Sequence, residues 1–142
     1  MNTLKYLLHT GGHSCVIRRD HAISTYDGKG IRDLLMLLES ESLTKAQVAD
    51  KVVGKAAASI MAAGGVSEVY ADVMSRTGAG LLESSGIAYS YGELTDYIKR
   101  ADGQGLCPME QLTLDATSAE EAVNRIKERI LGKTSHHNQT TV

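Results

Sequence analysis

The period of the hydrophobic positions changes along the first forty residues of the chain. Residues 3–10 and 30–40 carry apolar side chains at helical spacing, and the two segments between them, 14–20 and 21–27, are short and contain β-branched residues. A helical period predicts an amphipathic helix, and two short apolar runs joined by turn residues predict a hairpin. We therefore expect helix, hairpin and helix here, with the turn of the hairpin near Asp20.

The longest apolar stripe at helical spacing lies in residues 45–63. Thr44 and Gln47 have the spacing of a capping box, whose two side chains bond to backbone N–H groups at a helix start. Gly64 provides a helix end. The pattern predicts one helix over residues 45–63. Gly54 interrupts that helix at a cost of about 1 kcal/mol relative to alanine, which close approach of another backbone or of a ligand would explain.

The rest of the chain predicts further strands and helices in alternation. Strands are expected at 66–74 and 87–91, and helices at 77–85, from Cys107 onwards and at 118–131. A hairpin followed by a strand–helix–strand unit indicates a mixed sheet layered between helices, in the α/β or α+β class. We expect one domain over residues 1–132 and a disordered tail over residues 133–142.

Composition excludes several classes of protein. The chain has 142 residues, of which 42% are hydrophobic and 23% charged, ordinary values for a single globular domain. The net charge is −2 without a basic stripe, so nucleic acid is not an expected partner. No run approaches the roughly 18 apolar residues of a membrane span, and no signal-peptide pattern is present. Two cysteines do not make a disulfide framework, so we expect a soluble, reduced, cytoplasmic protein.

The segment around Cys107 is the first candidate for chemistry. Proline is favoured at the first helical position, so Pro108 makes Cys107 the expected N-cap and Glu110 the third helical residue. A thiol there faces unpaired N–H groups and the positive end of the helix dipole, which favour the thiolate, the form that attacks substrates or binds metals. Gly105, in the preceding loop, allows the backbone to approach a ligand. The alternative is an ordinary helix start with a buried thiol and a capping carboxylate.

A second candidate lies within the helix expected at 45–63. Asp50, Lys51 and Lys55 are charged, and the two lysines are neighbours at i, i+4. One interpretation is a solvated helix face, on which like charges repel slightly. The other is an anion seat, in which the two ammonium groups and the gap at Gly54 receive a ligand carboxylate or phosphate.

Two motifs together resemble a known family. The segments "VADKVVGKAAA" (48–58) and "GLCPMEQL" (105–112) are similar to those of a bacterial family of unknown function with a cytidine-deaminase-like fold. The resemblance covers roughly residues 3–131. It implies a three-layer α-β-α sandwich around a mixed sheet, with two active-site helices whose N-terminal ends meet. In the wider deaminase superfamily these helices hold zinc, and a glutamate shuttles protons.

Carried over by position, the resemblance places Asp50 where the proton-shuttling glutamate stands and Cys107 where the first zinc-binding cysteine stands. Glu110 replaces the second cysteine, and no histidine or cysteine matches the ligand on the first helix. A catalytic zinc site usually has three protein ligands, commonly His or Cys. We therefore expect neither a conventional zinc deaminase nor another metal or cofactor.

Three functions remain open from the sequence. The first is an enzyme, a deaminase-like hydrolase with an altered site, acting on a small nucleotide-like molecule. The second is a ligand-binding or regulatory domain without catalysis, and the third is an interaction module that forms homo-oligomers. For the first function the candidate catalytic residues are Cys107, Asp50, Lys51 and Glu110, and the candidate ligand-binding residues are Lys55, Gly54 and Gly105.

Overall fold

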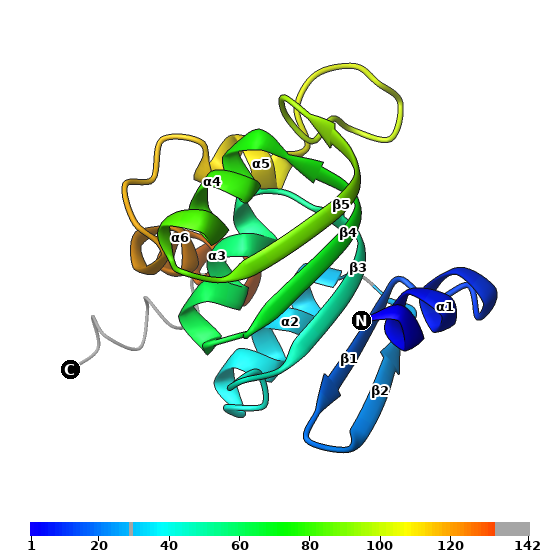
Figure 1. The fold of residues 1–142 in the computed structure, drawn as a ribbon. Coiled ribbons are helices and arrows are strands. Elements are labelled where there is room, and N and C mark those ends of the chain that lie inside the picture. Colours follow the sequence, from blue (N-terminus) through cyan, green and yellow to red (C-terminus); the bar gives the residue numbers. More distant parts are fainter. Residues whose placement is uncertain (29, 133–142) are drawn as a thin grey trace.

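The computed structural model of the chain describes residues 1–28 and 30–132 (Figure 1). Its elements are α1 (Asn2–Thr10), β1 (Cys15–Arg19), β2 (Ala22–Tyr26), α2 (Gly30–Glu39), β3 (Gln47–Val53), α3 (Lys55–Gly64), β4 (Glu68–Ser75), α4 (Arg76–Ser84), β5 (Ala88–Thr95), α5 (Pro108–Thr113) and α6 (Ala119–Leu131). The tail expected at residues 133–142 lies outside the described residues. No helix in the described ranges is long and apolar enough to cross a membrane.

The strands form one mixed sheet in the order β2-β1-β3-β4-β5. β1 runs antiparallel to both of its neighbours, whereas β3, β4 and β5 are parallel. Helix α1 packs on one face of the sheet, against β1 and β3, and α2, α3, α4 and α6 cover the other face (Figure 1). The α/β class with a mixed sheet is confirmed, and the layers are consistent with a three-layer sandwich.

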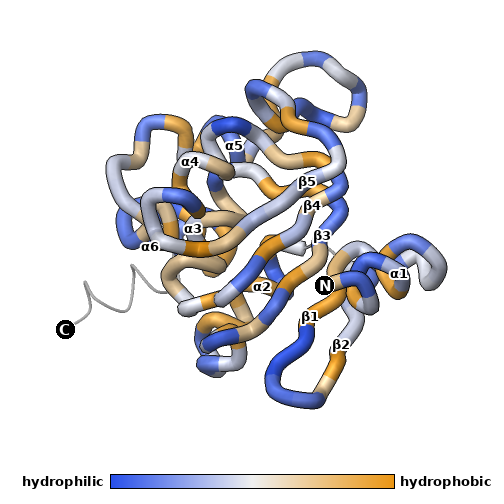
Figure 2. The backbone as a smooth tube through the Cα atoms, viewed as in Figure 1, coloured by the Kyte–Doolittle hydropathy of each residue, from blue (hydrophilic) through white to orange (hydrophobic). Residues whose placement is uncertain are grey.

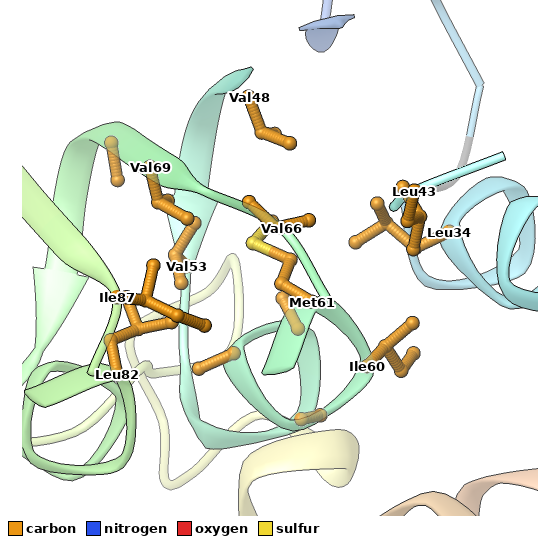
Figure 3. Packing of buried hydrophobic residues seen from close by; sticks show 14 of the residues in the cluster. Leu34, Leu43, Val48, Val53, Ile60, Met61, Val66, Val69, Leu82 and Ile87 are labelled. Carbon is orange, nitrogen blue, oxygen red and sulfur yellow. The ribbon is translucent and has the colours of Figure 1, made fainter. Parts of the chain in front are cut away.

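The two faces of the sheet have separate cores. On the α1 face, Leu4 and Leu8 pack with Val16, Ala49 and Tyr70. The larger core lies on the other face, where aliphatic side chains of the sheet meet those of α2, α3, α4 and α6. Figure 3 labels examples from the sheet and from α2, α3 and α4. Figure 2 shows hydrophobic and hydrophilic stretches alternating within the elements, as expected for helices and strands with one buried side.

The single helix expected at 45–63 is wrong in its first half. Residues Gln47–Val53 form the central strand β3, and the helix α3 begins only at Lys55. Strand β3 pairs with β1 on one side and β4 on the other, and both of its faces are covered near Val48 and Ala49. A strand buried on both faces has a continuous apolar run rather than alternation, and this run merged with the apolar stripe of α3 in the sequence.

The capping box and the interior glycine expected for this helix also have other roles in the structure. The capping box expected from Thr44 and Gln47 is absent, because the Gln47 amide instead bonds to the side chains of Arg18 and Glu68 across the sheet. Gly54 is not in a helix interior; it is the N-cap of α3. The glycine therefore marks the junction between strand and helix, where the side chains of Ile98 and Glu110 leave no room for a Cβ atom.

Candidate functional site

A cavity of about 270 Å³ lies where the carboxyl end of β3 meets the starts of α3 and α5. Its other walls come from α2 and from residues 96–106, the loop between β5 and α5, which we call the strap (Figure 1). In open sheets with parallel strands, ligands bind beyond the carboxyl ends of the strands, where connecting loops surround a crevice. Strand β3 is parallel to β4, so the cavity occupies a favoured position for a ligand.

Most of the cavity surface is apolar. Ile31 and Leu34 contribute from α2, Ile98 from the strap, and Met109 from α5. These residues come from segments far apart in the sequence, and the sequence reasoning did not place any of them at the site. Aliphatic residues at helical spacing are typical of any core-facing helix, so their pattern carried no signal of a cavity.

Asp50 is the buried acidic residue of β3 and faces this cavity. It is 6% exposed and lies beside the buried thiol of Cys15 in the register of the sheet. Burial raises the pKa of Asp50 to about 7, against the smaller lowering effect of the nearby backbone N–H groups of Val52 and Lys51, and the charge of Asp72 adds to the rise. Burial and the charge of Asp50 also raise the pKa of Cys15 well above its usual range.

One oxygen of the Asp50 carboxyl has no partner in the described part of the chain. Oδ1 accepts a long hydrogen bond of 3.4 Å from the N–H of Val52. The N–H of Lys51, although nearby, donates to the carbonyl of Ser14 at 3.1 Å. No described side-chain oxygen that is sealed from solvent lacks a hydrogen-bond partner. Oδ2 is therefore not sealed in the core, and it is available to a group in the cavity.

The start of α3 supplies unpaired donors to the same cavity. The N–H of Lys55 donates to Oε1 of Glu110 at 3.0 Å, and that of Ala58 to the carbonyl of Gly54. Among the described residues, no acceptor is bonded to the N–H groups of Ala56 and Ala57, both of which line the cavity. Such groups carry the positive end of the helix dipole.

Helices α3 and α5 cap each other with oppositely charged side chains. Glu110 of α5 is 2% exposed, and its carboxylate accepts the N–H of Lys55 at the start of α3 and the N–H of Ile98 in the strap, the latter at 2.5 Å. In return, Nζ of Lys55 donates to the carbonyls of Leu114 and Ala116 at the end of α5, at 2.9 and 2.7 Å. We call this arrangement the reciprocal cap.

Cys107 is the N-cap of α5, as the sequence predicted, and Pro108 is the first helical residue. The thiol is half-buried and lines the cavity, and it makes no hydrogen bond to the helix backbone. The backbone N–H of Cys107 donates to the carbonyl of Ile98 at 2.9 Å, which holds the strap against the start of α5.

The structure brings most of the candidate residues together. Asp50, Lys51, Gly54, Cys107 and Glu110 all line the cavity. The i, i+4 pairing expected for Lys51 and Lys55 is wrong, because Lys51 lies on strand β3 and Lys55 at the start of α3.

The remaining two candidates, Lys55 and Gly105, do not line the cavity. The ammonium group of Lys55 is engaged by the end of α5. Gly105 is outside the cavity lining; its φ of 89° places it in a turn of the strap, where its carbonyl accepts the N–H of Arg100. Glycine is the residue that adopts this φ without strain.

The side chains at the cavity do not fit the zinc site of the deaminase superfamily. Within residues 1–28 and 30–132, no group of three His, Cys, Asp or Glu side chains is placed to hold a metal ion. Cys107 and Asp50 remain as potential ligands, whereas both oxygens of Glu110 already accept backbone N–H groups. A catalytic zinc usually needs three protein ligands, so these side chains do not supply a zinc site of that kind.

Comparison with known proteins identifies a family. Residues 3–130 match the family model described as TM1506, domain of unknown function (DUF1893). The fold is similar to that of a DUF1893 family protein (TM1506) from Thermotoga maritima, with a TM-score of 0.83 and 24% sequence identity over 90% of this chain and 88% of that chain. The comparison with curated proteins gave no match. Because the family model spans nearly the whole sequence, the chain belongs to the DUF1893 family.

Proposed function

We propose that the cavity binds a small, nucleotide-like molecule and that Asp50 recognises its polar edge. The observation that carries this proposal is the buried Asp50, whose Oδ2 receives no hydrogen bond from the described residues, in an otherwise largely apolar cavity. No described side-chain oxygen that is sealed from solvent lacks a partner, so Oδ2 lies open to the cavity, where water can reach it. A ligand that donates a hydrogen bond to Oδ2 would take the place of that water.

The nucleotide-like character of the ligand rests on the resemblance to cytidine-deaminase-like proteins, which is part of the proposal. That resemblance implies a centre where two helix starts meet. In support, the starts of α3 and α5 are joined at the cavity through Lys55 and Glu110. Ile31, Ile98 and Met109 give the cavity apolar walls that an uncharged ring would contact, and ligand pockets commonly combine apolar walls with a few placed polar groups.

Catalysis on the bound molecule is a second candidate function. General acid–base catalysis is most efficient when the pKa of the group lies near the working pH. The pKa of Asp50 is raised to about 7, and the thiol of Cys107 lines the same cavity. Turnover would assign Asp50 to proton transfer and Cys107 to nucleophilic attack, whereas binding without turnover would indicate a regulatory domain.

The test is a binding screen of nucleobases and nucleosides against the full chain, followed by backbone amide NMR signals. We expect a bound compound to shift the signals of Asp50, Ala56 and Ala57. Asp50→Asn should weaken binding about tenfold, the effect of losing a hydrogen bond to a charged group. Asp20→Asn is the matched control, because Asp20 lies in the turn between β1 and β2, outside the cavity. Equal weakening by both variants, or no compound that shifts the cavity signals, would contradict the proposal.

A further inference from the structure

We infer that the ligand of this cavity presents an amide-type edge, an N–H donor beside a carbonyl oxygen, as in a lactam ring or a carboxamide. The inference rests on the proposed function, and it narrows the class of molecule from the polar groups that line the cavity. Two features carry it, one acceptor on β3 and two donors on α3.

The acceptor is Oδ2 of Asp50. Its residue is buried, and the described chain forms no hydrogen bond to this oxygen, although the N–H of Lys51 lies near the carboxyl. At a pH above about 7, where the Asp50 carboxyl is ionised, a bound molecule that offers only acceptors, such as a carboxylate or a phosphate, would place a like charge in the same cavity. Like charges at close range destabilise the charged forms of both groups. The carboxyl therefore selects a ligand with at least one N–H or O–H donor.

The donors are the N–H groups of Ala56 and Ala57 in the first turn of α3. They have no acceptor among the described residues, and they line the same cavity. A purely cationic ligand, with donors alone, would satisfy Asp50 but would face the positive end of the α3 dipole. These groups select a ligand that also carries an acceptor oxygen.

The charged side chains around the cavity do not change the preference for a ligand that has both a donor and an acceptor. The carboxylate of Glu110 is engaged by the N–H groups of Lys55 and Ile98, and the ammonium group of Lys55 is engaged by carbonyls at the end of α5. Lys51 lines the cavity, but its side chain is exposed, and the high dielectric of the surrounding water weakens its attraction for a bound anion. A neutral edge with a donor and an acceptor is the one that matches Oδ2 of Asp50 and the N–H groups of Ala56 and Ala57, none of which has a partner among the described residues.

Four compounds with the same ring and different edges test the inference on the full chain. Benzamide offers a donor and an acceptor, benzamidinium donors alone, benzoate acceptors alone, and toluene neither. We expect benzamide to bind about tenfold more tightly than each of the others, because each of the others leaves a polar group of the cavity unpaired. NMR titration should show the largest shifts for the amides of Asp50, Ala56 and Ala57.

The outcomes separate this inference from the proposed function. If toluene, benzoate or benzamidinium shifts the same signals with an affinity equal to that of benzamide, the edge inference is overturned while the cavity remains a binding site. If none of the four compounds shifts these signals at millimolar concentration, the edge inference is overturned, and the nucleoside screen decides the proposed function alone.

In Asp50→Asn the preference for benzamide over benzoate should fall to within about threefold, because the carboxylate that repels benzoate is gone. A preference that survives this substitution unchanged would also overturn the inference.

Discussion

Burial changes the charge state of Asp50, one of the residues that line the cavity. Its pKa rises from an ordinary value of 3.8 to about 7, chiefly because of burial. A raised pKa in the folded state means that the folded protein holds this proton more tightly than the unfolded chain does. The stability linked to the proton is fully present below the ordinary pKa of 3.8, and it is lost as the pH rises through about 7.

Replacing Asp50 should therefore change the pH dependence of the free energy of unfolding. Between pH 4 and pH 8, the native protein should lose about 4 kcal/mol more stability than Asp50→Asn, which has no carboxyl to ionise. Urea denaturation at a series of pH values measures both proteins. Parallel curves for the two proteins over this range would show that the carboxyl is hydrated rather than buried.

Glycine is required at position 54 because there is no room for a Cβ atom, and not because of the backbone conformation. Its φ is −101°, which any residue adopts, but a Cβ atom there would lie 2.8 Å from Cγ1 of Ile98 and 2.9 Å from Oε1 of Glu110. Gly54→Ala should destabilise the protein by about 1–3 kcal/mol, the usual range for overpacking. Gly80→Ala is the control, because a Cβ atom there meets nothing within 4 Å and alanine favours the helix by roughly 1 kcal/mol. Thermal or urea unfolding gives both values, and equal effects would refute the steric account.

At the scale of the elements, the reciprocal cap links α3 to the strap and to α5 through hydrogen bonds. One carboxylate holds the start of α3 and the strap, and one ammonium group holds the end of α5. Hydrogen bonds to charged groups contribute about 1.5–3 kcal/mol each. The strap and the start of α5, which together carry Ile98 and Cys107, should therefore depend on Glu110 more than on Lys55.

Labelling of Cys107 with a thiol reagent tests this difference. Glu110→Gln replaces one acceptor oxygen with a donor NH₂ group, so the N–H of Ile98 or Lys55 loses its partner, and we expect labelling about tenfold faster. Lys55→Met removes the ammonium group but leaves its backbone N–H bonded to Glu110, so labelling should stay within about twofold. Cys15 is buried and serves as the internal reference for global unfolding. Acceleration in both variants in proportion to lost stability would contradict a local role for Glu110.

The elements differ in how far the sequence predicts them. The hairpin around Asp20 was predicted correctly, and its turn residue has a φ of 57°, a conformation that Asp tolerates better than most residues. The start of α5 was also predicted, because Pro108 gives a local signal that packing does not override. Strand β3 was missed because its apolar run comes from burial on both faces, a property of its neighbours rather than of its own sequence.

At the scale of the whole molecule, the order of the strands and the path of the segments that connect them form the site. The cavity forms because β3 is central, because α3 leaves its carboxyl end at Gly54, and because the strap returns over it before α5. The sequence predicted that Asp50 and Cys107 would share a site, but it placed Asp50 on a helix. The roles of Glu110 and Lys55 in the reciprocal cap were not predictable, because their partners are backbone groups of segments distant in the chain.

The central claim is that the buried carboxyl of Asp50 faces a cavity that takes a ligand. The most direct measurement is an NMR titration of the Asp50 side-chain carboxyl carbon, in the free protein and with the tightest compound from the nucleoside screen. We predict a pKa of about 7 in the free protein and a lower pKa in the complex, because N–H donors from the ligand favour the ionised form. An ordinary pKa in the free protein, or one that the bound compound leaves unchanged, would contradict the account.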